Sequence, residues 1–184
     1  VGVVPVLTAA ERGLIPGKIV PVAANDFTDP EHPGTGVVVA HTVQSWKDLD
    51  RKNIASNADN SIPAAALEAR LKQEGVSGYS LVEIPSANRG LAVAGGNVTA
   101  ATMSEPYLTQ SLLRGDGKLL GWIVGGPPFE RVAHTSIVFS TEFGRRNPEG
   151  VKAYLRAHLA AVRWIDKNPD QAREVLARRM ILNL

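Results

Sequence analysis

The chain has 184 residues, of which 44% are hydrophobic and 21% are charged, a composition typical of a globular protein rather than of a disordered one. Its formal net charge of +2 excludes the dense basic surface that binds nucleic-acid backbones. No apolar run reaches the length of about eighteen residues that a membrane-spanning helix needs. The chain has no cysteine, which excludes disulfides, thiolate metal sites and thiol nucleophiles among these residues.

Two β-branched runs near the start of the chain predict strands at 18–24 and 36–41. The segment between them, 25–35, is rich in Asp, Asn, Pro and Gly, a composition that predicts a loop. After the second strand, Ser45 is followed three positions later by Asp48. This spacing predicts a short capped helix that runs into a further strand.

The clearest helix of the sequence follows at 61–74. Asn60 or Ser61 can cap its first turn, and Pro63 suits that turn because a proline there gives up no helical hydrogen bond. Ala and Leu fill the body of the helix, and Gly75 ends it.

The rest of the chain continues the alternation of strands and helices. The further strands are expected at 79–85, 97–103, 118–124 and 134–140. The further helices are expected at 88–95 and 105–115, with a pair of helices from 147 onward. Alternating strands and helices predict an α/β fold with a mainly parallel sheet and helices on its faces.

Two loops, 25–35 and 125–130, bracket a central block of strands and helices. They predict two α/β lobes joined by two crossing segments, an arrangement suited to hinge motion. Lobe I is expected to hold residues 1–42 and 126–184, and lobe II residues 43–125. The abrupt apolar start, VGVVPVL, and the ending MILNL predict a piece of a longer protein that lacks the N-terminal part of lobe I.

The start of the 61–74 helix is the strongest candidate binding feature. A helix N-terminus offers free N–H groups and a partial positive charge, which together attract an anion. Asn57, Asp59, Asn60 and Ser61 surround this helix start and can add side-chain hydrogen bonds. The alternative is that these residues only cap the helix.

Glu105, directly before Pro106, is the second candidate. A carboxylate at a helix start stays ionised beside the helix dipole and can accept a hydrogen bond from an amine or hydroxyl of a ligand. The alternative is that it only stabilises the helix that follows.

The sequence gives no sign of a catalytic or metal site, and no cofactor is expected. The four histidines have no metal-binding spacing with one another, and no GxSxG nucleophile motif occurs. The glycine-rich pieces at 95–97 and 125–128 lack the spacing of phosphate-binding loops.

The order of four stretches resembles the solute-binding proteins of ABC importers for nitrate, aliphatic sulfonates and taurine, a family that includes thiamine-pyrimidine precursor binders. These stretches are VGVVPVLTAAERGL, SWKDLDRKNIASNADNSIPAAALEARLKQEGV, LAVAGGNVTAATMSEPYL and the closing helices that follow HTSIVFS. The chain departs from the family pattern where Asn60 and Arg51 replace glycines and Thr99 replaces an aspartate. Because the chemistry of loops beside the cleft sets specificity, these departures leave the ligand class open.

This resemblance implies a type II periplasmic-binding-protein fold that captures a small organic or inorganic anion in a cleft between the lobes and delivers it to the membrane permease of an ABC importer. It implies a periplasmic or extracytoplasmic location, with a lipid anchor as one expected form, but no stable membrane insertion and no nucleic-acid partner. Ser61 is expected to hold the anionic group and Glu105 an amine or hydroxyl. Residues from the other lobe are also expected to face the ligand: Val4, Pro5, Thr8, Asn25 and Asp26.

Two other functions stay open. One is an enzyme on the same fold, such as a pyrimidine-precursor synthase or a desulfinase-like protein. The other is the effector-sensing domain of a transcription regulator. A full-length sequence would distinguish them, since a signal peptide, a cytoplasmic start and a DNA-binding helix-turn-helix point to different classes.

Overall fold

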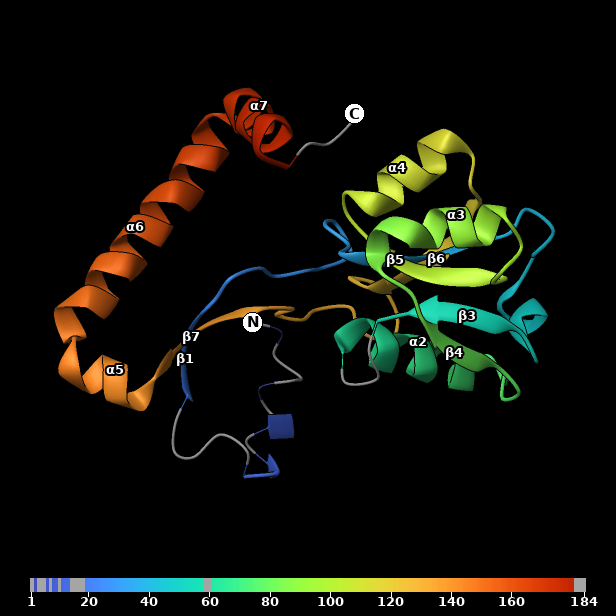
Figure 1. Cartoon of the computed structure of the whole chain (residues 1–184), viewed down its shortest axis with the longest axis horizontal. Helices are drawn as coiled ribbons and strands as arrows, with labels where there is room; N and C mark the ends of the chain where they lie inside the picture. The colour runs from blue at the N-terminus through green and yellow to red at the C-terminus, as the bar shows by residue number, and fades with distance from the viewer. Residues whose placement is uncertain are drawn as a thin grey trace. The chain divides into compact units, whose positions relative to one another are not determined.

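The computed structural model describes Gly2, Val6, Thr8, Ala9 and residues 11–13, 19–57 and 61–180 (Figure 1). Contacts divide the chain into two compact units. The first holds Val1–Pro16 and Pro21–Ile137, and the second holds Gly17–Val20 and Val138–Leu184. The predicted lobes, 1–42 with 126–184 and 43–125, stay a prediction.

A five-stranded sheet forms the centre of the first unit, in the order β4-β3-β5-β2-β6. Its strands are β2 (Thr35–Val39), β3 (Asn53–Ser56), β4 (Ser80–Glu83), β5 (Ala100–Ser104) and β6 (Lys118–Val124). β3 pairs in parallel with β4 and with β5, whereas β2 pairs antiparallel with both β5 and β6. The sheet is therefore mixed: β4, β3, β5 and β6 run in one direction, as a mainly parallel sheet predicts, but β2 runs against them and makes two of the four strand pairs antiparallel.

Helices cover both faces of this sheet. Figure 1 shows α2 (Ile62–Gln73) on one face, and α3 (Arg89–Ala94) and α4 (Tyr107–Arg114) on the other. Two further short helices are of the 3₁₀ type, η1 (Trp46–Leu49) and η2 (Ser86–Asn88). This is the layered α/β arrangement that the alternation of strands and helices predicts.

The core follows from the period of two along β2, whose five residues are all buried. Val37 and Val39 pack in one cluster with residues of α2 such as Leu67 and Leu71. Val38 packs in the opposite cluster with residues of α3 and α4. A strand buried on both faces reads as a continuous apolar run, which is how GVVVA appears in the sequence.

The short helix η1 has the cap that the sequence predicts. Oδ2 of Asp48 accepts hydrogen bonds from the N–H of Gln44 at 2.7 Å and of Ser45 at 2.8 Å. Both hydrogen bonds lower the pKa of Asp48 below its ordinary value, and the one from Gln44 has the larger effect.

We expect Asp48→Asn to lower the melting temperature at pH 7. The pKa of Asp48 is lower in the folded protein than its unfolded value of 3.8. The carboxylate therefore stabilises the fold at any pH above 3.8, and this stabilisation is lost as the pH falls through the lower folded-state pKa. Thermal melts of both proteins between pH 7 and pH 2 check this: the difference in melting temperature should shrink below about pH 4. A difference that does not change with pH would contradict the role given to the carboxylate.

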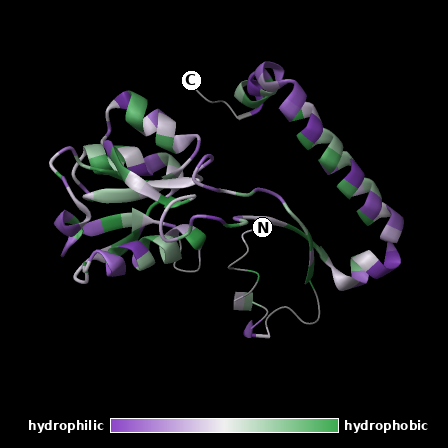
Figure 2. Ribbon diagram, turned by 180° about the vertical axis from the view of Figure 1, so that it is seen from behind, coloured by the Kyte–Doolittle hydropathy of each residue, from purple (hydrophilic) through white to green (hydrophobic). Residues whose placement is uncertain are grey.

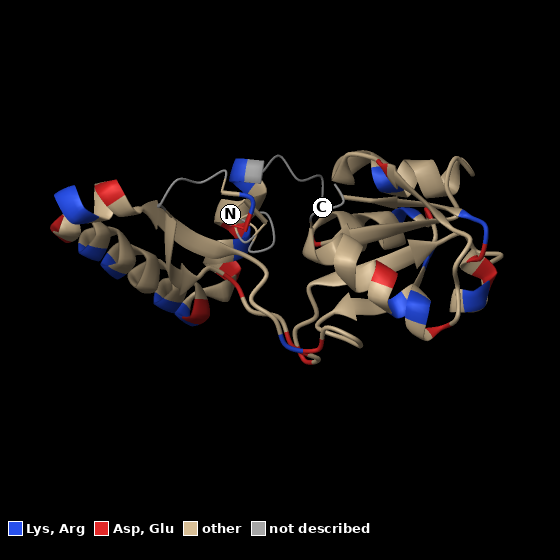
Figure 3. Ribbon diagram, turned by 90° about the horizontal axis from the view of Figure 1, so that it is seen from below, with Lys and Arg blue, Asp and Glu red and all other residues tan. Residues whose placement is uncertain are grey.

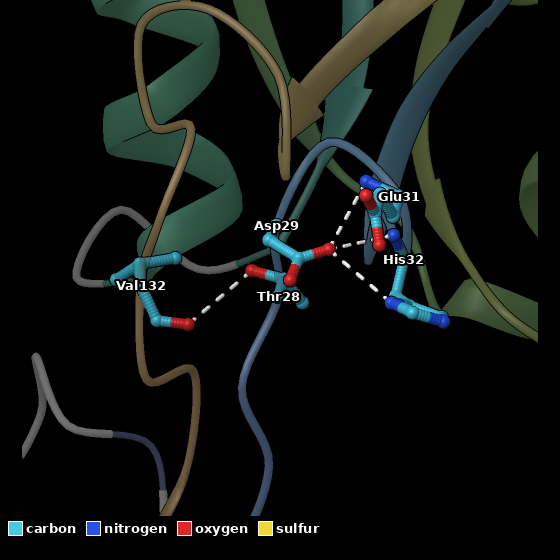
Figure 4. A network of polar contacts seen from close by, with 5 residues as sticks. All are labelled: Thr28, Asp29, Glu31, His32 and Val132. Atoms are coloured by element: carbon cyan, nitrogen blue, oxygen red, sulfur yellow. Dashed lines mark hydrogen bonds and ion pairs between the residues drawn. The ribbon is translucent and has the colours of Figure 1, made fainter.

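Two segments of the first unit run side by side: one lies between β1 (Ile19–Ala24) and β2, and the other between β6 and β7 (Ser136–Ser140). Thr28 and Val132 form an antiparallel bridge, and Oγ1 of Thr28 donates to the carbonyl of Val132 at 3.3 Å. Figure 4 shows Asp29 beside this bridge, where its Oδ1 accepts from the N–H of Glu31 at 3.0 Å and of His32 at 2.8 Å. The hydrogen bond from His32 is the main cause of a lowered pKa of Asp29. The predicted loop is thus an ordered turn.

The strands β1 (Ile19–Ala24) and β7 (Ser136–Ser140) pair with each other, and the boundary between the units passes through both. The second unit continues with α5 (Thr141–Arg146), α6 (Pro148–Lys167) and α7 (Pro169–Met180). The Phe139 ring stacks on that of Phe143 at 5.7 Å and meets Tyr154 edge-on at 5.5 Å, which joins β7, α5 and α6.

The long helix α6 is amphipathic, and Figure 2 shows polar and apolar residues alternating along it. Figure 3 shows Lys and Arg recurring along one side. The cations Lys152, Arg156, Arg163 and Lys167 are spaced by four, seven and four residues, which places them on one helical face, and all are exposed. These four side chains therefore form a basic, solvent-exposed face of α6.

Some boundaries differ from the predictions. α5 was not predicted; Ser140 caps it by accepting from the N–H of Phe143 at 3.0 Å. α4 begins at Tyr107, with Pro106 at its N-cap, rather than at 105 as predicted. Among the described residues, no helix combines the length and the apolar character that crossing a membrane requires.

Candidate functional site

Three parallel strands of the first unit end side by side, and the end of the sheet that their last residues form is its carboxyl edge. β4, β3 and β5 end at Glu83, Ser56 and Ser104, so the residues that follow them lie along the same edge. Ligands of open α/β sheets bind at such carboxyl edges. Two predicted site residues, Asn57 and Glu105, are the first residues after β3 and β5.

Arg89 is the residue that connects the three strand ends. Its Nε donates to the carbonyl of Ile84, just after β4, at 2.8 Å. Its Nη1 donates to Oδ1 of Asn57, just after β3, at 2.7 Å and to the carbonyl of Thr102 in β5 at 2.9 Å. Arg89 is 4% exposed, so these hydrogen bonds lie in the interior.

Among the described residues, the acceptors of Arg89 are all neutral: two carbonyl groups, one amide and, at 3.5 Å, the hydroxyl of Thr102. Within residues 19–57 and 61–180, no carboxylate forms an ion pair with its guanidinium. Burial lowers the pKa of Arg89, and the charge of Glu83 raises it. Arg89 therefore brings a buried positive charge to the strand edge.

Buried hydroxyls complete this edge. Oγ of Ser56 lies 3.2 Å from Oγ1 of Thr102, and both residues are fully buried between β3 and β5. Oγ1 of Thr35 lies 2.7 Å from Oγ of Ser104 across the β2–β5 pair. Polar groups in the interior thus concentrate where the three parallel strands end.

The start of α2 offers fewer free N–H groups than a helix N-terminus usually does. Oγ of Ser61 accepts from the N–H of Ala64 at 3.3 Å, and the carbonyl of Ser61 accepts from Ala65 at 3.0 Å. Pro63 has no N–H. Of the first-turn donors, the N–H groups of Ser61 and Ile62 are the ones that this cap does not use.

We expect Ser61→Ala to lower the free energy of unfolding by about 0.5–2 kcal/mol, because the variant loses the side-chain acceptor of the helix cap. Urea denaturation measures the change. A variant as stable as the wild type would show that the hydroxyl does not cap the helix.

Glu105 is exposed and turned toward the helix that follows it. Its Oε1 accepts from Oγ1 of Thr109 at 2.9 Å, and its Oε2 accepts from the N–H of Thr109 at 3.2 Å. These contacts match the expected alternative of a helix-start carboxylate, and ligand contact by Glu105 stays a prediction.

The structure describes only some of the remaining predicted residues. Pro5, Asp59 and Asn60 are outside the described residues, as is Val4. The carbonyl of Thr8 accepts from the N–H of Arg12 at 3.1 Å. Asn25 is exposed and donates through Nδ2 to Oγ1 of Thr135 at 3.1 Å. Oδ1 of Asp26 accepts from the N–H and from Oγ1 of Thr135.

A second candidate lies at the opposite edge of the same sheet. An open pocket of about 410 Å³ is lined by residues that flank the amino ends of β3 and β5, including Asp48, Lys52 and Thr99. In the described part of the chain, no group of three or more His, Cys, Asp or Glu side chains could hold a metal ion.

The sequence reasoning missed Arg89. It begins a helix of six residues after a weakly marked strand, and nothing in its neighbourhood distinguishes it from a solvated arginine. Only the pairing of β3 with β4 and β5 brings Asn57, Ile84 and Thr102 around it.

Solved structures with a similar fold include periplasmic binding proteins, and this chain has a mixed α/β fold of that kind. The model of the NMT1-like family matches residues 20–180, and the chain belongs to that family. No curated protein matches the chain.

Three of the similar structures illustrate the likeness. The periplasmic aliphatic sulphonate binding protein SsuA from Escherichia coli has a TM-score of 0.79 and 20% identity over 98% of this chain and 60% of its own. The alkanesulfonate-binding protein SsuA from Xanthomonas axonopodis pv. citri, bound to MOPS, gives the same values. The periplasmic nitrate-binding protein NrtA from Synechocystis PCC 6803 has a TM-score of 0.66 and 15% identity over 88% of this chain and 45% of its own. The chain thus spans about 60% of the length of the first two.

Proposed function

We propose that this chain is part of an extracytoplasmic solute-binding protein that captures a small anion and delivers it to the permease of an ABC importer. The anion binds at the carboxyl edge of β4, β3 and β5. The observation that carries this proposal is the buried guanidinium of Arg89, which lies across all three strand ends and has neutral acceptors among the described residues.

The physical argument starts from the energy of a buried charge. Taking an ion out of water is costly unless hydrogen bonds and opposite charge compensate it. Neutral acceptors among the described residues take the N–H groups of Nε and Nη1 of Arg89, but they leave its net charge. An anion at the same edge is attracted more strongly than it would be in water, because the surroundings have a low dielectric constant.

The comparisons support the choice among anions. The printed names of the similar structures describe binding proteins for sulfonates and nitrate, and two of them are described as periplasmic. We therefore favour binding over catalysis and a sulfonate or nitrate-like ion as the solute. Closure of two lobes around that solute belongs to the same proposal. Ser61 then contacts the anionic group, and Glu105 contacts an amine or hydroxyl where the solute has one.

Thermal melts of the full-length protein with methanesulfonate, MOPS, taurine, nitrate and acetate test the proposal. A ligand that binds only the folded state adds about 2.7 kcal/mol of stability at a hundredfold excess over its Kd, and so raises the melting temperature. Dimethyl sulfone, which is close in shape to methanesulfonate but neutral, is the control and should give no shift. If none of these five solutes raises the melting temperature more than dimethyl sulfone does, the proposal fails.

A further inference from the structure

The side-chain amide of Asn57 has a defined orientation, because its neighbour is an arginine. A guanidinium can only donate hydrogen bonds, so the Asn57 atom that lies 2.7 Å from Nη1 of Arg89 must be the oxygen. The usual ambiguity between the oxygen and nitrogen of an amide is therefore removed at this position. The NH₂ group of Asn57 consequently faces away from Arg89.

No described residue accepts a hydrogen bond from this NH₂ group. Asn57 is half-buried and stands directly after β3, at the carboxyl edge of the parallel strands. The contact with Arg89 also polarises the amide, since a cation at the oxygen makes the N–H groups stronger donors.

We propose that Asn57 is the anion-recognition residue of this edge: its NH₂ group donates to an oxygen of the bound solute, and Arg89 is the positioning residue that fixes the amide and supplies the positive charge behind it. This inference rests on the proposed function and specifies the solute group. The group must be an acceptor without a proton of its own, such as a sulfonate, a nitrate or an ionised carboxylate. A donor group could not form a hydrogen bond with the N–H groups of Asn57, which are themselves donors.

Asn57→Asp separates this role from a purely structural one. The aspartate still accepts from Arg89, now as an ion pair, so the three strand ends stay connected. It removes both donors, and it puts a negative charge where the solute oxygen binds. We expect the affinity for methanesulfonate and MOPS, measured by isothermal titration on the full-length protein, to fall by about 100-fold or more, because the charge-assisted hydrogen bond is lost and a negative charge then faces the anion. The urea midpoint should equal or exceed that of the wild type.

Asn53→Asp is the matched control. It makes the same change of charge at the exposed first residue of β3, at the opposite end of the same strand. Its affinity for both probes should stay within about twofold of the wild type, because the added charge is screened by solvent. If Asn57→Asp does not fold, Asn57→Ser takes its place. That variant keeps an acceptor for Arg89 and is expected to lose about tenfold in affinity, one charge-assisted hydrogen bond.

The outcomes separate the two proposals. If the wild type binds the probes and Asn57→Asp binds them as tightly, Asn57 does not recognise the anion and this inference is wrong, while anion binding stands. If the wild type binds none of the anions, both proposals fall. A loss confined to Asn57→Asp, with the Asn53→Asp control unchanged, supports the inference.

Discussion

Replacing Gly125 with alanine is expected to lower the free energy of unfolding by about 2–5 kcal/mol. Gly125 follows β6 with a φ of +80°, a conformation that costs a residue with a side chain about 1–2 kcal/mol. An added Cβ would also meet backbone atoms, with Cα of Pro33 at 2.4 Å and the carbonyl oxygen of Asp29 at 2.7 Å. Overpacking of this kind adds about 1–3 kcal/mol, because backbone has to move.

Gly75→Ala is the matched control for this prediction. Gly75 has a similar φ of +73°, but no atom lies within 4 Å of the position that a Cβ would take. It should therefore lose only the conformational part, about 1–2 kcal/mol. Urea denaturation of both variants measures the difference. Equal losses would show that the two adjoining segments do not pack at Gly125 as tightly as described.

The second large effect is expected from Arg89→Met. The methionine fills part of the space but donates nothing, so the carbonyls of Ile84 and Thr102 and the amide oxygen of Asn57 lose their donor. Each buried acceptor left without a partner costs about 1–3 kcal/mol, and removing the buried charge returns part of this. We expect a net loss of about 2–4 kcal/mol together with the loss of anion binding.

Two variants bracket this result in the same denaturation series. Arg89→Lys keeps the charge but cannot reach three strand ends with one ammonium group, so it should be less stable than the wild type and still bind anions weakly. Arg156→Met removes an exposed arginine of α6 and should change stability by no more than about 0.5 kcal/mol. If Arg89→Met is as stable as Arg156→Met, Arg89 does not hold the strand ends together.

The sequence predicts the features that depend on neighbours in the chain. Ser45 with Asp48, Ser61 with Pro63, and the apolar run of β2 are local signals, and the structure confirms the short helix, the cap of α2 and the strand. Each of these features is decided within a few residues, by hydrogen bonds of a helix turn or by burial of consecutive side chains.

The features that depend on strand order could not be predicted in this way. The reversed direction of β2 follows from its pairing with β5 and β6, which are separated from it by some sixty residues or more in the sequence. The role of Arg89 depends on the same kind of long-range pairing. The sequence therefore names Asn57 as a candidate and places the positive end of the site at the helix start, whereas Arg89 enters the proposed site only through the structure.

A crystal structure of the full-length protein with methanesulfonate or MOPS bound tests the central claim most directly. The account predicts a sulfonate oxygen within hydrogen-bond distance of Nδ2 of Asn57, at the edge where β3 and β5 end, with Arg89 still bonded to Oδ1. A sulfonate in the pocket at the opposite edge, beside Lys52 and Thr99, would contradict the claim.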